Sequence, residues 1–413
     1  MIQKIELDNG VRILAESIPH VRSVSMGVWI GTGSRNEHKE ENGISHFLEH
    51  MFFKGTKTRS AAQIAETFDR IGGQVNAFTS KEYTCYYAKV LDDHSKIAID
   101  VLSDMFFNSL FEKTELAKER NVVLEEIKMV DDTPDDIVHD LLSEASYGKH
   151  SLSYPILGTV ETLETFTEEH LRDYMDRFYT GDYVVVSIAG NITDEIIEQI
   201  KEVFSAVKPT TYELKREAPV FIPEKIIRKK ETEQAHLCLG YPGLEIGHKD
   251  VYGLVLLNNL LGGSMSSRLF QEIREQRGLC YSVFSYHSSY QDSGMLTVYA
   301  GTAHKQLDEL IEAVHMTTAN LAEKGMTEKE LANGKEQLKG NLMLSLESTN
   351  SRMSRNGKNE LLLKQHRSLD EIIQEINDVQ LDEVNKIAKL ILTNNPSISL
   401  INATGEMPEA LQG

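Results

Sequence analysis

Two histidines, His46 and His50, stand four residues apart, and Glu49 lies directly before the second. If this stretch is helical, the spacing places both imidazoles on one face, one turn apart. Two imidazoles so placed can bind one metal ion, and the Glu49 carboxylate can reach a water molecule on that ion. The alternative is a chance pair on an amphipathic helix, because the flanking apolar residues would pack in a core in either case: Ile44, Phe47, Leu48 and Met51.

The order His-x-x-Glu-His is one of the patterns found in zinc peptidases, and it reverses the commoner His-Glu-x-x-His. A catalytic zinc ion usually takes three protein ligands and keeps one position open for water, so a third Asp, Glu, His or Cys is required. Candidates for this third ligand lie in residues 114–130, which we expect to form one helix. Thr114 is the expected N-cap, and the run from Asp131 to Pro134 is the expected end.

Two glutamates of this helix fall on its inward face. Glu119, Val123, Glu126 and Val130 follow the helical period, whereas Glu125 points about 100° away and can be solvated. A carboxylate on a buried face is costly unless it is paired or bound to a metal ion. Glu119 and Glu126 are therefore candidates for the metal site. The alternative is that both pair with arginine or lysine from elsewhere in the chain.

Together these features resemble the pitrilysin-type (inverzincin) metallopeptidases. The nearer match is their short branch, typified by the mitochondrial processing peptidase β-subunit and its bacterial homologues. The resemblance implies that one Zn²⁺ per chain is bound by His46, His50 and a glutamate 76 residues after His50, which is Glu126. It implies that Glu49 is the general base. The family's additional acidic residue, seven positions before the third ligand, falls on Glu119.

Two further motifs carry the same resemblance. Arg274 to Tyr281 resembles the Arg-x6-Tyr element that reaches the active site from a later domain, so Tyr281 or Arg274 would stabilise the oxyanion or hold the substrate backbone. Gly72 to Thr79 resembles the strand that pairs with substrate. The residues implied for substrate binding are Val75, Asn76, Ala77, Phe78 and Thr79.

We therefore expect a zinc-dependent endopeptidase in which Glu49 takes a proton from the attacking water and later delivers it to the leaving amine. Pairing of the substrate as an added strand requires flexible or extended peptides. The alternative function is a non-catalytic or partner-dependent binding or assembly subunit of the same fold. Gly31-Thr32-Gly33-Ser34 lacks the remaining residues of a dinucleotide or phosphate loop, so nucleotide binding is not expected.

The resemblance also leads to an expectation about assembly. In longer relatives the Arg-x6-Tyr element faces the metal domain across a chamber. Transferred to this chain, the implied arrangement is a homodimer with composite active sites. Each site would combine His46, Glu49, His50 and Glu126 of one copy with Arg274 and Tyr281 of the other.

Charge and composition agree with this function. The formal net charge of −20 argues against nucleic acid or an anionic membrane as the main partner. The sequence has no apolar run of about 18 residues, so no membrane-spanning helix is expected. Its start lacks the pattern of a signal or transit peptide, and we expect a cytoplasmic location, in a bacterium. Cys85, Cys238 and Cys280 have no metal-site or disulfide spacing and are expected to be reduced.

The chain divides into two similar halves, with residues 1–210 as the metal-binding domain, a linker at 211–225, and a second homologous domain at 226–413. Proline residues and mixed charges mark the linker. The expected fold class is α+β, with two α/β-sandwich domains, each a mixed and mostly antiparallel sheet packed against helices. In the second half, the helix expected around residues 252–261 has no histidine or glutamate, so that half carries no metal ligands.

The same patterns predict individual elements. Ser60 to Gln63 forms a capping box for a helix that ends at Gly72-Gly73. A hairpin is expected over 74–79 and 83–90, and longer helices from about Asp93 and from Thr114. The other expected strands are 24–30, 183–191, 235–241, 281–286, 295–300 and 397–403.

Overall fold

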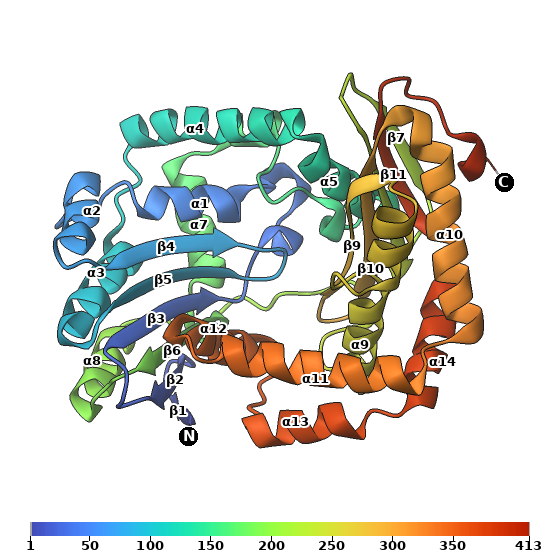
Figure 1. The fold of residues 1–413 in the computed structure, drawn as a ribbon. Coiled ribbons are helices and arrows are strands. Elements are labelled where there is room, and N and C mark those ends of the chain that lie inside the picture. The colour runs from blue at the N-terminus through green and yellow to red at the C-terminus, as the bar shows by residue number, and fades with distance from the viewer. Residues whose placement is uncertain (1, 413) are drawn as a thin grey trace. The chain divides into compact units, whose positions relative to one another are not determined.

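The computed structural model describes residues 2–412, which form two compact units (Figure 1). The first unit comprises the residues up to Lys128, Tyr154–Arg216 and Met343–His366. The second comprises Met129–Ser153, Glu217–Leu342 and the residues from Arg367 onward. Each unit therefore includes a segment from the other half of the chain. None of the helices within residues 2–412 is both long and apolar enough to cross a membrane.

The first unit is built on a six-stranded sheet in the order β1-β2-β6-β3-β5-β4. Strands β2 and β6 are parallel, and every other neighbouring pair is antiparallel. Strand β4 lies at one end of this order and pairs with β5 alone among the described residues. The strands are β1 (Ile2–Glu6), β2 (Arg12–Ser17), β3 (Ser23–Ile30), β4 (Gln74–Thr79), β5 (Thr84–Leu91) and β6 (Val184–Gly190).

The second unit repeats this topology in a five-stranded sheet ordered β7-β11-β8-β10-β9. Its parallel pair, β7 and β11, corresponds to β2 and β6, and its remaining pairs are antiparallel. The strands are β7 (Lys225–Lys229), β8 (Ala235–Pro242), β9 (Cys280–Ser289), β10 (Gly294–Thr302) and β11 (Ser397–Asn402). The expected fold class, with two similar domains that each pack a mixed sheet against helices, is confirmed.

The central strands of each sheet are buried on both faces, and one face of the sheet is covered by a helix from the other half of the chain. In the first unit this helix is α12 (Thr349–Leu362), where the Ser187 hydroxyl of β6 donates to the Met353 carbonyl at 2.8 Å. In the second it is α5 (Pro134–Tyr147), where the Ser399 hydroxyl of β11 donates to the Val138 carbonyl at 2.7 Å. The two units thus repeat both the strand order and the docking of this exchanged helix.

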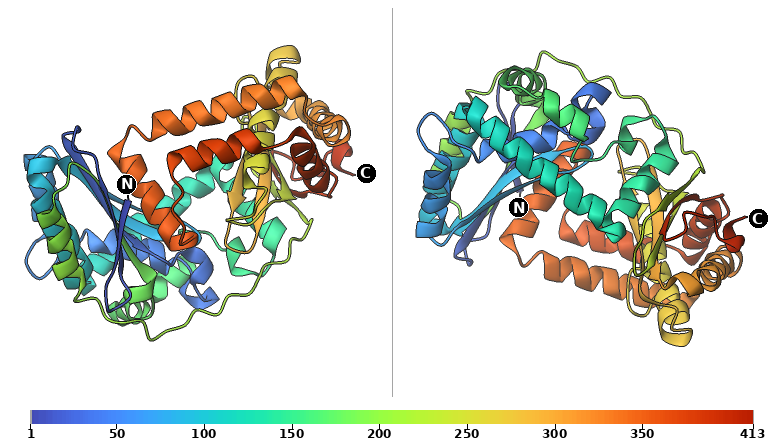
Figure 2. Two further views of the ribbon diagram at one scale, coloured as in Figure 1. Left: turned by 90° about the horizontal axis from the view of Figure 1, so that it is seen from below. Right: turned by 90° about the horizontal axis from the view of Figure 1, so that it is seen from above.

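The opposite face of the first sheet carries the unit's main hydrophobic core. Helix α4 lies over α1 on this side of the sheet (Figures 1 and 2). The longer helices are α1 (Ile44–Phe52), α2 (Ala61–Arg70), α3 (Ser95–Asn108), α4 (Lys113–Asp132), α6 (Val160–Thr165), α7 (Glu168–Phe178) and α8 (Asp194–Phe204). Short 3₁₀ turns are η1 (Ser34–Asn36), η2 (Lys39–Glu41), η3 (Asp92–His94) and η5 (Gly181–Tyr183).

The second sheet has a separate core of the same kind. Its helices are α9 (Val251–Leu261), α10 (Leu307–Lys324), α11 (Glu328–Ser345), α13 (Leu369–Asp378) and α14 (Leu381–Leu392). Residues Phe270–Gln276 form the π-helical segment η6. The 3₁₀ turns are η4 (Ser151–Ser153), η7 (His304–Gln306) and η8 (Glu409–Leu411).

Most of the elements expected from the sequence are present within a few residues of their predicted bounds. The Ser60 capping box is confirmed, with the Ser60 hydroxyl accepting from the Gln63 amide. The prediction for Thr114 was wrong, because α4 begins one residue earlier at Lys113. Strands β1, β2 and β7 were not predicted. Residues 208–224 contain no helix or strand, and β7 begins at Lys225.

Candidate metal centre

Helix α1 presents one polar face and buries the other. Ile44, Phe47, Leu48, Met51 and Phe52 are at most 1% exposed and join the core under the sheet. The helical period leaves His46, Glu49 and His50 together on the remaining face. Burial of the apolar face therefore fixes where the polar face points.

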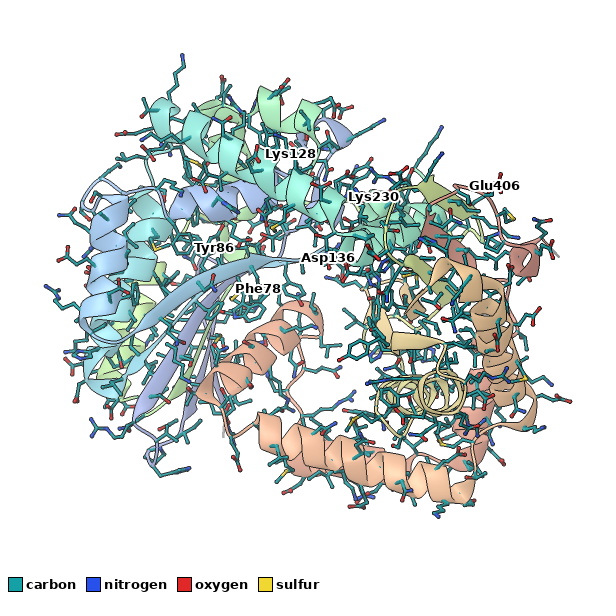
Figure 3. The ribbon with its side chains drawn as sticks, turned by 45° about the horizontal axis from the view of Figure 1, so that its top comes forward. Phe78, Tyr86, Lys128, Asp136, Lys230 and Glu406 are labelled. Carbon is teal, nitrogen blue, oxygen red and sulfur yellow. The ribbon has the colours of Figure 1, made fainter. Side chains whose placement is uncertain are left out.

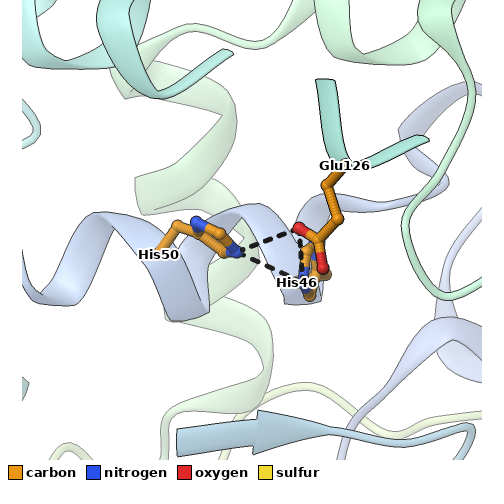
Figure 4. Close-up of side chains that lie close together, drawn as sticks. All are labelled: His46, His50 and Glu126. Atoms are coloured by element: carbon orange, nitrogen blue, oxygen red, sulfur yellow. Dashed lines mark hydrogen bonds and ion pairs between the residues drawn. The ribbon is translucent and has the colours of Figure 1, made fainter. Parts of the chain in front are cut away.

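Three possible ligand atoms converge above this polar face (Figure 4). Nε2 of His50 lies 3.3 Å from Nε2 of His46 and 3.6 Å from Oε2 of Glu126. The third separation, from His46 Nε2 to the same Oε2, is 3.8 Å. Ligand atoms about 2.0–2.1 Å from a tetrahedral zinc ion lie about 3.3–3.4 Å apart. The three atoms are thus spaced nearly as the corners of such a coordination sphere.

A hydrogen bond fixes the ring of His50. Its Nδ1 lies 2.7 Å from Oε1 of Glu119, and Nζ of Lys54 lies 2.6 Å from the other oxygen of that carboxylate. Burial alone would raise the pKa of Glu119, but the bonds from His50 and Lys54 outweigh it and lower the pKa. An ionised Glu119 accepts a hydrogen bond from Nδ1 of His50, which directs Nε2 of that ring toward the cluster.

His46 is held neutral by its surroundings. Burial, with a smaller effect of the nearby His50, lowers the pKa of His46 to about 3. Its buried Nδ1 has no hydrogen-bond partner among residues 2–412. A neutral imidazole is the form that binds metal ions.

The donor set therefore fits a divalent cation of the zinc type. Two imidazole nitrogens 3.3 Å apart, with a carboxylate oxygen within 3.8 Å of both, are the ligand types that such a cation takes. Glu126 is half-buried, with 32% of its side chain exposed. Its neighbour Glu125 is 72% exposed, as the helical period predicted. The Glu125 carboxylate pairs with Lys128 at 2.7 Å.

Glu49 lies beside these groups without joining them. The Thr79 hydroxyl, at the end of β4, donates to Oε2 of Glu49 at 2.6 Å. Burial raises the pKa of Glu49, while the hydrogen bond from Thr79 opposes the shift. The carboxylate is thereby made more basic and is oriented by the edge strand.

Strand β4 divides its side chains between two environments. Val75 and Ala77 pack against the core on the α1 side, and Thr79 on the same face bonds Glu49. Asn76 and Phe78 point to the other face and are exposed. Phe78 lies 5.7 Å from the Trp29 ring, and Figure 3 shows it on the other side of the sheet from Tyr86.

Arg274 and Tyr281 belong to the second unit, whereas the residues described above belong to the first. The Arg274 guanidinium stacks 4.8 Å from the centre of the Tyr281 ring, and Tyr281 is 78% exposed. Arg274 belongs to the π-helical segment η6, a conformation frequent at functional sites. The pair thus forms an exposed cation–π unit.

Sequence patterns missed two contacts of the centre. Lys54 lies shortly after the end of α1. No periodic spacing in the sequence indicated its ion pair with Glu119. Thr79 was expected to contact substrate, which stays a prediction, and the bond from its hydroxyl to Glu49 was not predicted. The spacing of charged residues around His50 suggested neither contact, because both depend on how α4 and β4 pack on α1.

Comparison with known families gives matches along most of the chain. Residues 12–160 match the family described as Insulinase (Peptidase family M16), and residues 165–338 match the Peptidase M16 inactive domain. The uncharacterized zinc protease YmxG of Bacillus subtilis is 63% identical over 408 residues, covering 99% of this chain and 100% of that protein. An uncharacterized zinc protease of Streptomyces coelicolor is 39% identical, covering 97% of this chain and 89% of that protein.

Solved structures show the same fold. A protease from Helicobacter pylori superposes with a TM-score of 0.89 at 22% identity, covering 97% of this chain and 99% of that one. A Pseudomonas fluorescens structure titled peptidase M16 inactive domain gives a TM-score of 0.89 at 20% identity, covering 97% of each chain.

The positions of Glu126 and Glu125 lead to a paired prediction. Glu126→Gln weakens zinc binding at least about tenfold, because it removes one of three converging ligand atoms. Glu125→Gln leaves zinc binding unchanged, because its side chain is exposed and pairs with Lys128. Zinc titration and metal analysis of the purified variants measure both. The reverse result would assign the third ligand to Glu125.

Proposed function

The chain belongs to peptidase family M16, and on that premise we propose that it is a zinc-dependent endopeptidase that cleaves flexible or extended peptides. The observation that carries the proposal is the convergence of His46, His50 and Glu126, with the carboxylate of Glu49 beside them. These are the groups that hydrolysis of a peptide bond by activated water requires.

His46, His50 and Glu126 would hold the zinc ion. Zinc at this position supplies a Lewis acid for the scissile carbonyl and lowers the pKa of water toward neutrality. Glu119 supports the site through His50, since its hydrogen bond to Nδ1 fixes the ring and its tautomer. Lys54 favours the ionised form of Glu119 and so also helps to fix the His50 ring.

Glu49 is the proposed general base. It accepts a proton from the attacking water and returns it to the nitrogen of the leaving amine, so the carboxylate is regenerated in each cycle. Its raised pKa makes it a better base than a solvated glutamate, and Thr79 keeps one oxygen oriented.

The substrate is proposed to add to the free edge of β4. Within the described residues this strand has one paired neighbour, so its other edge can pair with an extended peptide. Peptide side chains would then alternate between the face of Thr79 and the face of Phe78. Backbone pairing of this kind excludes folded substrates and gives the residues Val75 to Thr79 a role in binding.

The site is proposed to be completed by a second copy of the chain. Tyr281 is 78% exposed and the Arg274 side chain 34% exposed, and the Arg274 guanidinium lies 4.8 Å from the Tyr281 ring centre and 3.9 Å from the Glu275 carboxylate. They are available to stabilise the oxyanion or hold the substrate backbone of a partner copy. A symmetric homodimer would form two such composite sites at once. A cytoplasmic location stays a prediction.

Cleavage of a peptide library by the purified protein tests the proposed function. We expect cleavage of unstructured peptides that stops with a chelator and returns with Zn²⁺. Glu49→Gln should retain zinc but lose at least about a hundredfold in turnover, because the ion remains held while proton transfer is lost. Near-normal turnover of this variant would exclude Glu49 as the base. Zinc binding without any cleavage would favour the alternative, a non-catalytic or partner-dependent subunit.

The pH profile provides a second prediction. Glu49 must be ionised to accept a proton, so activity falls as the pH drops through its pKa, which burial raises. Thr79→Val removes a bond that favours the ionised form, and the acidic limb of kcat/KM should move to higher pH while the plateau changes little. Thr67→Val is the control, because within residues 2–412 that hydroxyl bonds the Gln63 carbonyl of its own helix and no group of the metal centre. A limb that stays in place or moves to lower pH would refute the coupling of Thr79 to Glu49.

Complementation tests the composite site. Glu49→Gln and Tyr281→Phe chains should each be inactive alone. A mixed dimer contains one site with wild-type Glu49 from one chain and wild-type Tyr281 from the other, so it should regain about half the activity of a wild-type dimer. Subunit exchange is followed with differently tagged chains. Proven exchange without recovery would mean that each site is built within a single chain.

A further inference from the structure

Glu37 is a buried carboxylate at the start of the proposed metal-binding helix. It is 4% exposed and lies in the loop before α1, seven residues ahead of the first turn. Its Oε2 accepts from the Gly43 amide at 2.7 Å and from Nδ2 of Asn42 at 2.9 Å. Its Oε1 accepts from the Ser45 amide at 2.9 Å. One side chain thus satisfies two of the amide groups that a helix start leaves unpaired.

The residues at the start of α1 offer no substitute for this cap. The N-cap position is Gly43, which has no side chain and a positive φ of 95°. No acidic residue stands in the first turn. Gly43 is also too close to Gly158 to accept a larger residue, since a Cβ there would meet the Gly158 Cα at 2.6 Å. The cap must therefore come from outside the helix, and Glu37 supplies it.

The groups around Glu37 are hydrogen-bond donors, which favour its ionised form. Burial raises its pKa, and the hydrogen bonds from Gly43, Ser45 and Asn42 oppose the rise. All of those partners are donors, so a protonated carboxyl would have to place its own hydrogen against one of them. Ionisation is the state that satisfies every contact.

The charge of Glu37 matters because His46 is the third residue of α1. The start of a helix carries a partial positive charge, equivalent to about half an elementary charge, which disfavours a nearby cation. A divalent ion on His46 would lie close to this positive end. A carboxylate at the helix start offsets it, as acidic groups do at other helix N-termini.

We propose that Glu37 is a positioning residue of the metal centre, which fixes the first turn of α1 and neutralises the helix end where a divalent cation binds His46. This inference rests on the proposed function for the presence of the ion. Glu37 is not proposed to contact zinc or substrate. It acts through the backbone amides of Gly43 and Ser45, which precede His46.

Two substitutions separate charge from shape. Glu37→Gln keeps the size of the side chain but loses the charge, whereas Glu37→Asp keeps the charge but shortens the reach. If the charge matters, Glu37→Gln should weaken zinc binding about tenfold or more, and Glu37→Asp should weaken it less. A purely steric role predicts the opposite order, because glutamine matches the size of glutamate better than aspartate does.

Zinc dissociation constants are measured by competition with a chromophoric chelator, and thermal unfolding of the metal-free protein is recorded alongside. Glu360→Gln is the matched control. Glu360 is also buried in the first unit, but it pairs with Lys4 at 2.8 Å and His366 at 2.6 Å, away from the centre. This variant should lose thermal stability and keep its zinc affinity. If Glu37→Gln does not fold, the zinc affinity of Glu37→Asp is compared with that of Glu360→Asp.

The outcomes distinguish this inference from the proposed function. Zinc affinity within about twofold of wild type in Glu37→Gln, or a larger loss in Glu37→Asp than in Glu37→Gln, would overturn the role of Glu37 alone. In the fallback pair, a zinc affinity of Glu37→Asp that is less than about tenfold weaker than that of Glu360→Asp supports the proposal, because the charge is retained, and a loss of about tenfold or more overturns it. Absence of zinc binding in the wild-type chain would instead remove the proposed metal centre and this inference with it.

Discussion

The first unit is organised around two imidazole nitrogens and a carboxylate oxygen held within contact distance of one another. Nε2 of His46 and Nε2 of His50 are only 3.3 Å apart, and burial keeps His46 neutral. Polar groups gathered in a partly buried site cost free energy unless they are paired or share a cation. The packing of α1 and α4 on the sheet maintains this arrangement, because the apolar face of α1 cannot turn without exposing its core residues. The hydrophobic core thus holds a polar cluster that would not form by itself.

Strand β4 connects this cluster to the proposed substrate edge. Its inward residues pack under α1, its last residue bonds Glu49, and its outer edge is unpaired among the described residues. A peptide bound along that edge would be aligned with the strand that also orients the base. Substrate positioning and proton transfer would then share one rigid element, which is how precise geometry is kept without a dedicated lid.

The sequence predicted the fold class and the cluster through two periodicities. Helical spacing of His46 and His50, and of Glu119 and Glu126, identified four side chains that the structure brings together. Alternating apolar residues identified most strands. The sequence did not indicate that α5 and α12 pack on the sheet of the other half of the chain. An amphipathic pattern predicts that a helix has a buried face, but it does not identify the sheet that buries this face. Contacts of Lys54, Thr79 and Glu37 were equally invisible, since they join residues whose spacing along the chain has no period.

The second unit has the same topology, and the cluster of possible metal ligands found among residues 2–412 lies in the first unit. Helix α9 occupies the place of α1 between corresponding strands, and leucines fill its buried face. It still makes a hydrogen bond to its edge strand, where the Ser285 hydroxyl of β9 donates to Oδ1 of Asn258 at 2.8 Å. In the first unit the corresponding kind of contact joins Thr79 to a carboxylate. A neutral amide needs no counter-ion, so α9 can pack on its sheet without the supporting charges that surround α1. The charged residues around His46 and His50 are therefore explained by the proposed chemistry of that unit, because the shared fold is complete without them.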